Sequence, residues 1–193
     1  MSRPIPVDII PSHIHLSEED QVALFGASYA LTVGEHLSQT GQVAYEESLE
    51  VRGALKRSIS LRVLGPCREN TQVELTPTEA QLLGIAASTA RSGDNTQAAD
   101  CTLDGPAGSV RAAASVIIPQ PHLHCSDAEA AHLRLQNGKM VTVDIVGDRP
   151  CTLHDVVVRV HPTYRLRLHI HPDLARENWL TGVMHGRIRE NGL

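Results

Sequence analysis

The sequence predicts a mainly β fold, organised as a sandwich or a barrel, with a few short helices. Most periodic segments alternate polar and apolar residues with a period of two, which is typical of strands that bury one face. Turn signals such as Gly-Pro at 65–66 and Asn-Gly at 137–138 recur along the chain. Many short strands with close turns favour a sandwich or a barrel over alternating strands and helices. A repeated histidine motif also divides the chain into two related halves.

Four segments carry the strand pattern most clearly. Residues 58–64, 141–146 and 165–170 alternate, whereas residues 155–160 are more continuously apolar. Residues 88–97 combine small, polar and charged side chains, and we expect them to form a surface loop.

Three short helices are predicted from their start signals. Ser17, Thr76 and Ser126 each stand three residues before an acidic residue and close to an apolar run. A hydroxyl at the cap and an acid three positions later satisfy amide groups at a helix start. Pro77 suits the first position of its helix, and Gly84 suits the end of the same helix.

One motif occurs twice in the chain. Residues 9–17 (IIPSHIHLS) resemble residues 117–126 (IIPQPHLHCS), and each copy leads into a predicted capped helix. Each copy therefore runs from a strand through His-x-His to a helix start, which indicates two related halves.

The composition excludes several classes of protein. With 41% hydrophobic and 20% charged residues, the chain can build a core, so we do not expect global disorder. A net charge of −5 and an aromatic content of 3% argue against nucleic acid as a partner. The chain contains no run of about 18 apolar residues, so we expect neither a membrane span nor a membrane partner. The four cysteines are widely spaced, which predicts reduced, buried thiols.

Histidine is the unusual feature of the composition, with eleven residues. On a strand, residues i and i+2 point to one face about 6.6 Å apart, so two imidazoles can converge on one metal ion. A single pair is more often solvated than a ligand pair, but three pairs, two of them in the repeated motif, favour a metal function. Imidazole and carboxylate ligands suit zinc and similar divalent ions. The pairs are His13/His15, His122/His124 and His169/His171.

Arg68 and Glu74 follow a Gly-Pro turn, and the residues alone leave two interpretations of each open. Arg68 is either a surface charge or a phosphate-binding group beside a metal, because its planar fork binds two oxygens at once. Glu74 lies either on a solvated strand face or in the site. Cys67 is either a buried thiol or a nucleophile activated by the adjacent arginine.

These residues resemble the phosphate propanoyltransferases, the PduL-type phosphotransacylase family of bacterial microcompartments and their relatives. The likeness covers nearly the whole chain, and its ordered motifs are HIHLS at 13–17, LSQTGQ at 37–42, VLGP at 63–66, TQVE at 71–74, DGPAGS at 104–109 and HLH at 122–124. The resemblance implies two small β-barrels. Residues 12–120 would form the first, and residues 121–193 the second, which the N-terminal strand within 1–11 would complete.

The resemblance also implies an acyltransferase that converts a short-chain acyl-CoA, acetyl- or propanoyl-CoA, and phosphate reversibly to acyl phosphate and CoA. Two Zn²⁺ ions per chain would lie between the barrels. One would meet the CoA sulfur, and the other would have open positions for water or phosphate. Their ligands would be His13, His15 and Glu74 for the first ion, and His122, His124 and His169 for the second. Arg68 matches the arginine that is expected to bind phosphate.

The chain departs from the family pattern at three of these positions. Ser12 and Pro121 stand where the family commonly has an arginine before each His-x-His. His171 stands where an acid is usual, which makes it an extra ligand or an outer-sphere group. Two other functions stay open: a zinc-dependent hydrolase on a small β-barrel, and a catalytically inactive metal-binding scaffold, which Ser12 and Pro121 favour.

The first residues show no charged-then-apolar secretion signal, and prolines at 4, 6 and 11 disfavour a helix there. We expect a cytoplasmic enzyme, with the lumen of a bacterial microcompartment as the alternative. Its expected partners are acyl-CoA and phosphate, a second copy of the chain in a homo-oligomer and, inside a microcompartment, shell or cargo proteins.

Overall fold

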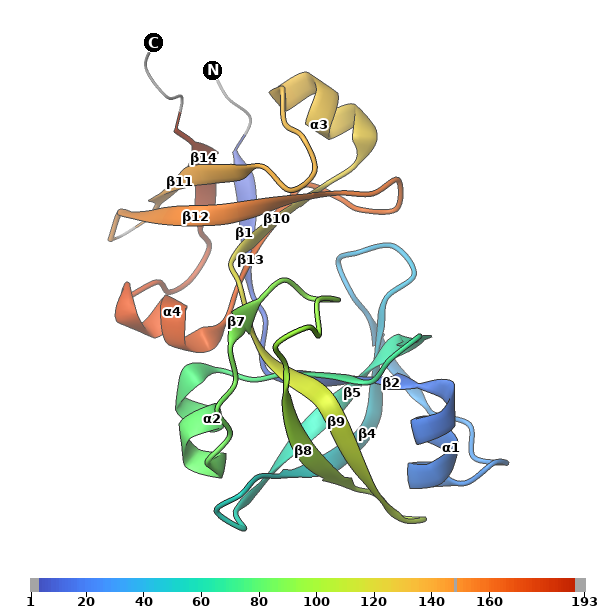
Figure 1. The fold of residues 1–193 in the computed structure, drawn as a ribbon. Helices are drawn as coiled ribbons and strands as arrows, with labels where there is room; N and C mark the ends of the chain where they lie inside the picture. Colours follow the sequence, from blue (N-terminus) through green and yellow to red (C-terminus); the bar gives the residue numbers. More distant parts are fainter. Residues whose placement is uncertain (1–3, 148, 190–193) are drawn as a thin grey trace. The chain divides into compact units, whose positions relative to one another are not determined.

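The computed structural model describes residues 4–147 and 149–189 (Figure 1). The chain forms two compact units. One comprises Pro11–Pro119, and the other joins the N-terminal segment up to Ile10 to the segment that begins at Gln120. Each unit contains one β-barrel, called here the first barrel (within 11–119) and the second barrel.

The first barrel closes through six strands, all within the fully described segment 11–119. Its unit contains β2 (His13–Ser17), α1 (Glu18–Phe25), β3 (Val33–His36), β4 (Val43–Arg52), β5 (Ser58–Arg68), β6 (Gln72–Glu74), α2 (Pro77–Leu83), β7 (Thr89–Ala90), β8 (Ala99–Asp104) and β9 (Ser109–Pro119). Neighbouring strands pair in the order β4, β5, β2, β6, β9 and β8, and β8 pairs back to β4. The short strands β3 and β7 extend from β4 and β9.

The second barrel closes through six strands of the described part of its unit. That unit contains β1 (Ile5–Ile9), β10 (His122–Cys125), α3 (Asp127–Leu133), β11 (Met140–Val146), β12 (Cys151–Val160), β13 (Arg167–Ile170), α4 (Pro172–Glu177) and β14 (His185–Ile188). The closed order is β1, β13, β10, β12, β11 and β14. Figure 1 shows β1, in blue, among the yellow-to-red strands from the other end of the chain.

The two barrels share one strand plan. In the first, β2 pairs parallel with β5 and antiparallel with β6. In the second, β10 pairs parallel with β12 and antiparallel with β13. The strand that precedes each His-x-His strand closes the other barrel, since β1 pairs with β13 and β9 pairs with β6. The predicted fold class, a mainly β chain with two small barrels related by an internal repeat and a few short helices, is confirmed.

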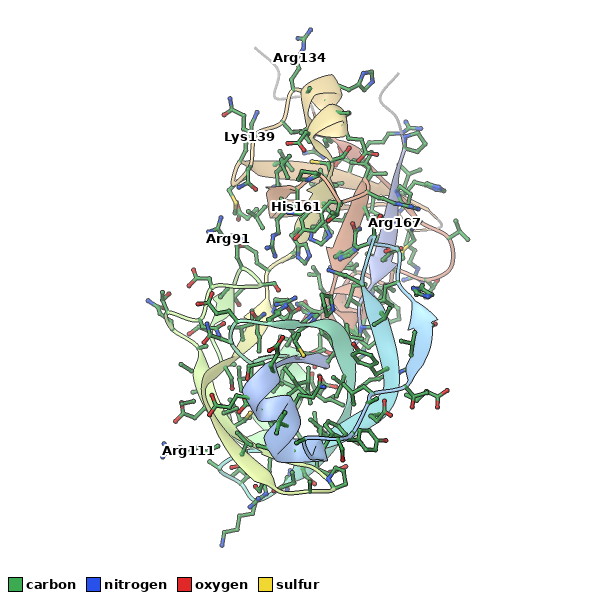
Figure 2. All side chains as sticks on the ribbon, turned by 90° about the vertical axis from the view of Figure 1, so that its right-hand side faces the viewer. Arg91, Arg111, Arg134, Lys139, His161 and Arg167 are labelled. Atoms are coloured by element: carbon green, nitrogen blue, oxygen red, sulfur yellow. The ribbon has the colours of Figure 1, made fainter. Side chains whose placement is uncertain are left out.

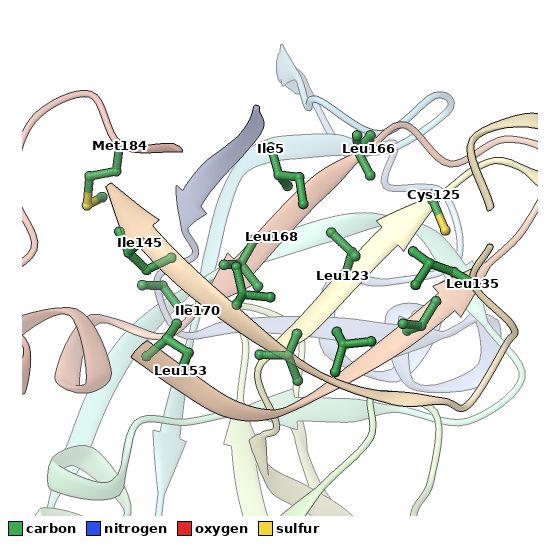
Figure 3. Close-up of a cluster of buried hydrophobic side chains, with 14 of the residues drawn as sticks. Ile5, Leu123, Cys125, Leu135, Ile145, Leu153, Leu166, Leu168, Ile170 and Met184 are labelled. Carbon is green, nitrogen blue, oxygen red and sulfur yellow. The ribbon is translucent and has the colours of Figure 1, made fainter. Parts of the chain in front are cut away.

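Both barrels are filled with aliphatic side chains. Leu123 and Leu168 lie on paired strands of the second barrel and are fully buried. Figure 3 shows them gathered with Ile5 from β1 and Ile145 from β11. Alternation along a strand then places His122 and its pair partner on the opposite face of β10. The core residues therefore decide which face of the strand carries the histidines.

The three predicted helices are present and capped as expected. The hydroxyls of Ser17, Thr76 and Ser126 each accept a hydrogen bond from the amide three residues later. A fourth helix, α4, was not predicted, because its cap is His171 rather than a serine, threonine, asparagine or aspartate. The expected loop at 88–97 also contains the two-residue strand β7.

None of the helices in the described ranges 4–147 and 149–189 is both long and apolar enough to cross a lipid bilayer.

If β1 is an integral strand of the second barrel, then Ile5, the β1 residue whose side chain lies in the barrel core, must contribute to the stability of the protein. Ile5 is 1% exposed, whereas Ile9 on the same strand is 37% exposed. We expect Ile5→Ala to lower the free energy of unfolding by about 2–5 kcal/mol, because it opens a cavity in the core. Ile9→Ala is the matched control and should cost less than about 1 kcal/mol. Urea denaturation followed by circular dichroism measures both, and equal losses would contradict the role assigned to β1.

Candidate metal centres

The first barrel brings three predicted ligands together, which we call the first centre: His13, His15 and Glu74. Strand β2 supplies both histidines, and its register with β6 places Glu74 directly opposite His13. The Nε2 atom of His13 lies 3.6 Å from Oε2 of Glu74, and the two imidazole centroids are 5.0 Å apart. All three side chains are buried. Buried imidazoles and a carboxylate on one face of two paired strands form a donor set that suits zinc.

Glu74 is held by a network that runs to Arg68. The side-chain amide of Gln72 donates to Oε1 of Glu74 at 2.8 Å and to Ser92 Oγ at 3.2 Å. The Oε1 atom of Gln72 itself accepts a hydrogen bond from Arg68 Nη1 at 3.3 Å and another from the backbone amide of Gly93 at 2.7 Å. Arg68 also donates to Ser92 Oγ at 3.0 Å. Gln72 therefore connects the carboxylate, the arginine and the loop after β7.

The electrostatics of the first centre favour the protonation states that bind metal. Burial by itself would raise the pKa of Glu74, but electrostatic attraction to His13, a hydrogen bond from Ser92 and attraction to His15 and Arg68 lower that pKa to about 2. Burial, followed by the charge of Arg68, lowers the pKa of His15 well below its ordinary value. At neutral pH the carboxylate is ionised and the His15 imidazole is neutral, which are the forms that ligate a divalent cation.

The first histidine of each pair is oriented by the same contact. Nδ1 of His13 hydrogen-bonds the carbonyl of Pro11 at 2.8 Å, and Nδ1 of His122 hydrogen-bonds the carbonyl of Gln120 at 2.9 Å. A carbonyl only accepts, so Nδ1 carries the proton and Nε2 keeps the lone pair for a ligand. Within the described residues, Nδ1 of His15 has no hydrogen-bond partner, although it is buried.

The second barrel holds the other predicted set, called here the second centre: His122, His124 and His169. The histidine pair comes from β10, and the register of β13 places His169 opposite His122. The three ligand nitrogens all lie within 4.8 Å of one another, and all three side chains are buried. Nε2 of His169 has no hydrogen-bond partner among the described residues. Tyr164 stacks on His124 with ring centroids 4.0 Å apart. Three buried imidazoles that converge, one of them with a ring nitrogen that makes no hydrogen bond to the described residues, fit a divalent cation.

The remaining predicted residues have other partners. His171 caps α4, with its Nδ1 accepting from the amide of Leu174 at 3.2 Å. Ser12 accepts from the amide of Thr76 at 3.1 Å and donates to Glu79, so it belongs to the cap of α2. Burial, followed by the charge of Glu18, raises the pKa of the Cys67 thiol. The arginine beside Cys67 therefore does not produce a thiolate at neutral pH.

Sequence reasoning missed the supporting residues Gln72, Ser92 and Tyr164. Gln72 had a usable signal, because it lies two residues before Glu74 and so shares its strand face. Ser92 and Tyr164 lie in segments without periodicity, and only tertiary structure brings them to the histidines and Glu74.

Comparison with known proteins identifies close relatives over most of the chain. A family model described as phosphate propanoyltransferase matches residues 6–179. A phosphate propanoyltransferase of Priestia megaterium is 39% identical over 187 residues, which cover 95% of this chain and 86% of the relative. One from Shewanella putrefaciens is 36% identical over 181 residues, covering 93% and 85%. One from Salmonella typhimurium is 37% identical over 174 residues, covering 90% and 82%.

The network around Gln72 predicts a loss of stability when its polar atoms are removed. Gln72→Met keeps the length of the side chain but leaves the Gly93 amide and Arg68 without their acceptor, so the free energy of unfolding should fall by about 1–3 kcal/mol. Gln81→Met, at an exposed position on α2, is the control and should change it by less than about 0.5 kcal/mol. Urea denaturation measures both variants, and indistinguishable midpoints would refute the importance of the network.

Proposed function

This chain belongs to the phosphate propanoyltransferase family and is an acyltransferase, and on that premise we propose a two-zinc reaction. It converts acetyl- or propanoyl-CoA and phosphate reversibly to acyl phosphate and CoA. The observation that carries the proposal is that both barrels present a buried donor set on equivalent pairs of strands, β2 with β6 in the first barrel and β10 with β13 in the second.

Each centre would hold one zinc ion. The first centre offers two imidazoles and a carboxylate, and the second offers three imidazoles. Three protein ligands leave a position for a further ligand, as catalytic zinc sites require. In this proposal the CoA sulfur approaches the first centre, and phosphate or water approaches the second. When bound, the ions supply Lewis acidity that stabilises the departing thiolate and the phosphate charge.

Arg68 would bind phosphate. Its Nη1 atom is anchored by Gln72 and Ser92, which ties the guanidinium to the network that holds Glu74. Arg68 also lines an open cavity of about 850 Å³ on the first barrel, so an anion from solvent can reach it. A planar guanidinium binds two phosphate oxygens at once and remains charged at neutral pH.

The transfer would be direct. A phosphate oxygen attacks the thioester carbonyl carbon, an acyl–oxygen bond forms, the carbon–sulfur bond breaks, and CoA leaves as its thiolate. The raised thiol pKa values of all four cysteines support a route without an acyl-cysteine. Held together, the two substrates gain the advantage of proximity, which supplies several kcal/mol of the barrier.

A single assay separates this function from the two alternatives, the zinc-dependent hydrolase and the inactive metal-binding scaffold. Zinc-dependent formation of acyl phosphate from acyl-CoA supports the transferase. Hydrolysis of a substrate without phosphate dependence would identify a hydrolase, and bound zinc without turnover would identify an inactive scaffold.

Location and assembly are further parts of the proposal. We propose a cytoplasmic location, with the lumen of a bacterial microcompartment as the alternative. Exposed Trp179 and Val183 support a homo-oligomer, or contacts with shell or cargo proteins. Light scattering and co-sedimentation with shell proteins distinguish these states.

Removing one ligand of the second centre should abolish turnover. His122→Ala should lower kcat/KM by more than about 100-fold, because even outer partners of a metal site contribute about 10–100-fold. The zinc content should fall from about two ions per chain to about one. His132→Ala, on the exposed face of α3, is the control and should keep both zinc and activity. Retained activity in His122→Ala would refute a role for the second centre.

Replacing the proposed phosphate ligand should affect one substrate selectively. Arg68→Gln should lower kcat/KM for phosphate by about 10–100-fold, because a charge-assisted hydrogen bond contributes about 1.5–3 kcal/mol. The KM for acyl-CoA and the zinc content should change little. Arg57→Gln, at an exposed turn, provides the matched loss of charge. A rise in both KM values to the same extent would argue against phosphate recognition by Arg68.

A further inference from the structure

A carboxylate reaches the second centre from the opposite end of the chain. Strands β1 and β13 run parallel, and their register pairs Asp8 with His169. Paired residues of neighbouring strands project to the same face, so Asp8 lies on the face that carries the histidines. Its Oδ2 atom lies 3.6 Å from Nε2 of His169, the ring nitrogen that has no hydrogen-bond partner among the described residues.

Arg167, labelled in Figure 2, holds the other oxygen of this carboxylate. Its Nη1 atom donates to Oδ1 of Asp8 at 2.9 Å. Arg167 lies two residues before His169 on β13 and so shares its face. The ion pair leaves Oδ2 as the carboxylate oxygen nearest to His169 Nε2.

The distance of 3.6 Å between Asp8 Oδ2 and His169 Nε2 is close to the spacing of two ligands of one ion. A hydrogen bond between nitrogen and oxygen spans about 2.7–3.2 Å. Two donors bound about 2.0–2.2 Å from one tetrahedral zinc lie about 3.3–3.5 Å apart. The first centre shows the same value, because His13 Nε2 and Glu74 Oε2 are also 3.6 Å apart. Each barrel thus places one carboxylate oxygen at ligand spacing from one imidazole nitrogen.

We propose that Asp8 is a carboxylate ligand of the second centre, which would then bind its divalent cation through His122, His124, His169 and Asp8 and take phosphate or water as a fifth ligand, an expansion that catalytic zinc sites allow. The inference rests on the proposed function, since it assumes that this centre takes a metal. Asp8 reaches the centre beside His169, at 3.6 Å, and lies outside the group of three imidazoles whose ligand atoms are all within 4.8 Å of one another, so its carboxylate would move closer when the ion binds. The carboxylate adds a negative charge to a set that otherwise consists of imidazoles, and it favours a hard or borderline divalent ion such as zinc.

The test measures zinc binding rather than activity. Asp8→Asn should weaken zinc binding at the second centre by at least about 10-fold in a chelator competition, because it removes the charged ligand atom. Asp144→Asn is the matched control: Asp144 also pairs with an arginine, Arg189, in the same unit. It should leave zinc affinity unchanged. Equal zinc affinity in Asp8→Asn and the control would overturn the proposal.

Two further variants separate a ligand from an ion-pair partner. Asp8→Cys, loaded with Co²⁺, should gain near-ultraviolet thiolate-to-cobalt absorption that the loaded wild type lacks, and its absence from a folded, loaded variant would overturn the proposal. Arg167→Gln should keep most of the zinc affinity, since it retains the carboxylate. A loss as large as that of Asp8→Asn would instead assign Asp8 to the ion pair alone.

The failure of this inference and of the proposed function give different results. Wild-type protein that binds fewer than two zinc ions overturns the two-zinc function itself. Wild-type protein that binds two, with an affinity that Asp8→Asn leaves unchanged, overturns only the role of Asp8.

Discussion

Both candidate metal centres depend on one physical constraint, the alternation of side chains along a strand that closes a barrel. Ile14 and Leu16 of β2 belong to the core, so His13 and His15 must occupy the opposite face. The same rule acts on β10, where Leu123 is a core residue. The register of the neighbouring strand then fixes the third donor, so the barrel positions it rather than a flexible loop. A slip of one residue would turn every donor into the core.

Collecting donors on a buried face is destabilising unless their polar atoms find partners. The chain supplies backbone carbonyls to the first histidine of each pair and the Gln72 network to Glu74. Nδ1 of His15 and Nε2 of His169 are left without hydrogen bonds among the described residues. A cation that satisfied these atoms would bind the folded state alone and stabilise it, so metal binding and folding would be coupled.

The sequence predicts what depends on local pattern. Period-two strands, hydroxyl caps and the two His-x-His pairs are local, and each was recognisable. Glu74 needed the family resemblance, because a lone acid on a strand is equally consistent with a solvated face. Asp8 could not be found, since its relation to His169 exists only once strands from both ends of the chain pair in register. Helix α4 was missed because an imidazole replaces the usual hydroxyl or carboxylate at its cap.

The exchange of strands between the repeats has a consequence for how the protein emerges from the ribosome. The first barrel draws all its strands from residues 13–119, so it can close while the rest of the chain is still being made. Strand β1 precedes the other described strands in the chain, yet its partners β13 and β14 follow most of them. During translation the edges of β1 therefore stay unpaired until β13 and β14 have been made. The second barrel depends on these long-range contacts, so we expect it to fold slowly. A circular permutation that moves β1 behind β14 would make all contacts of the second barrel more local while keeping its strand order.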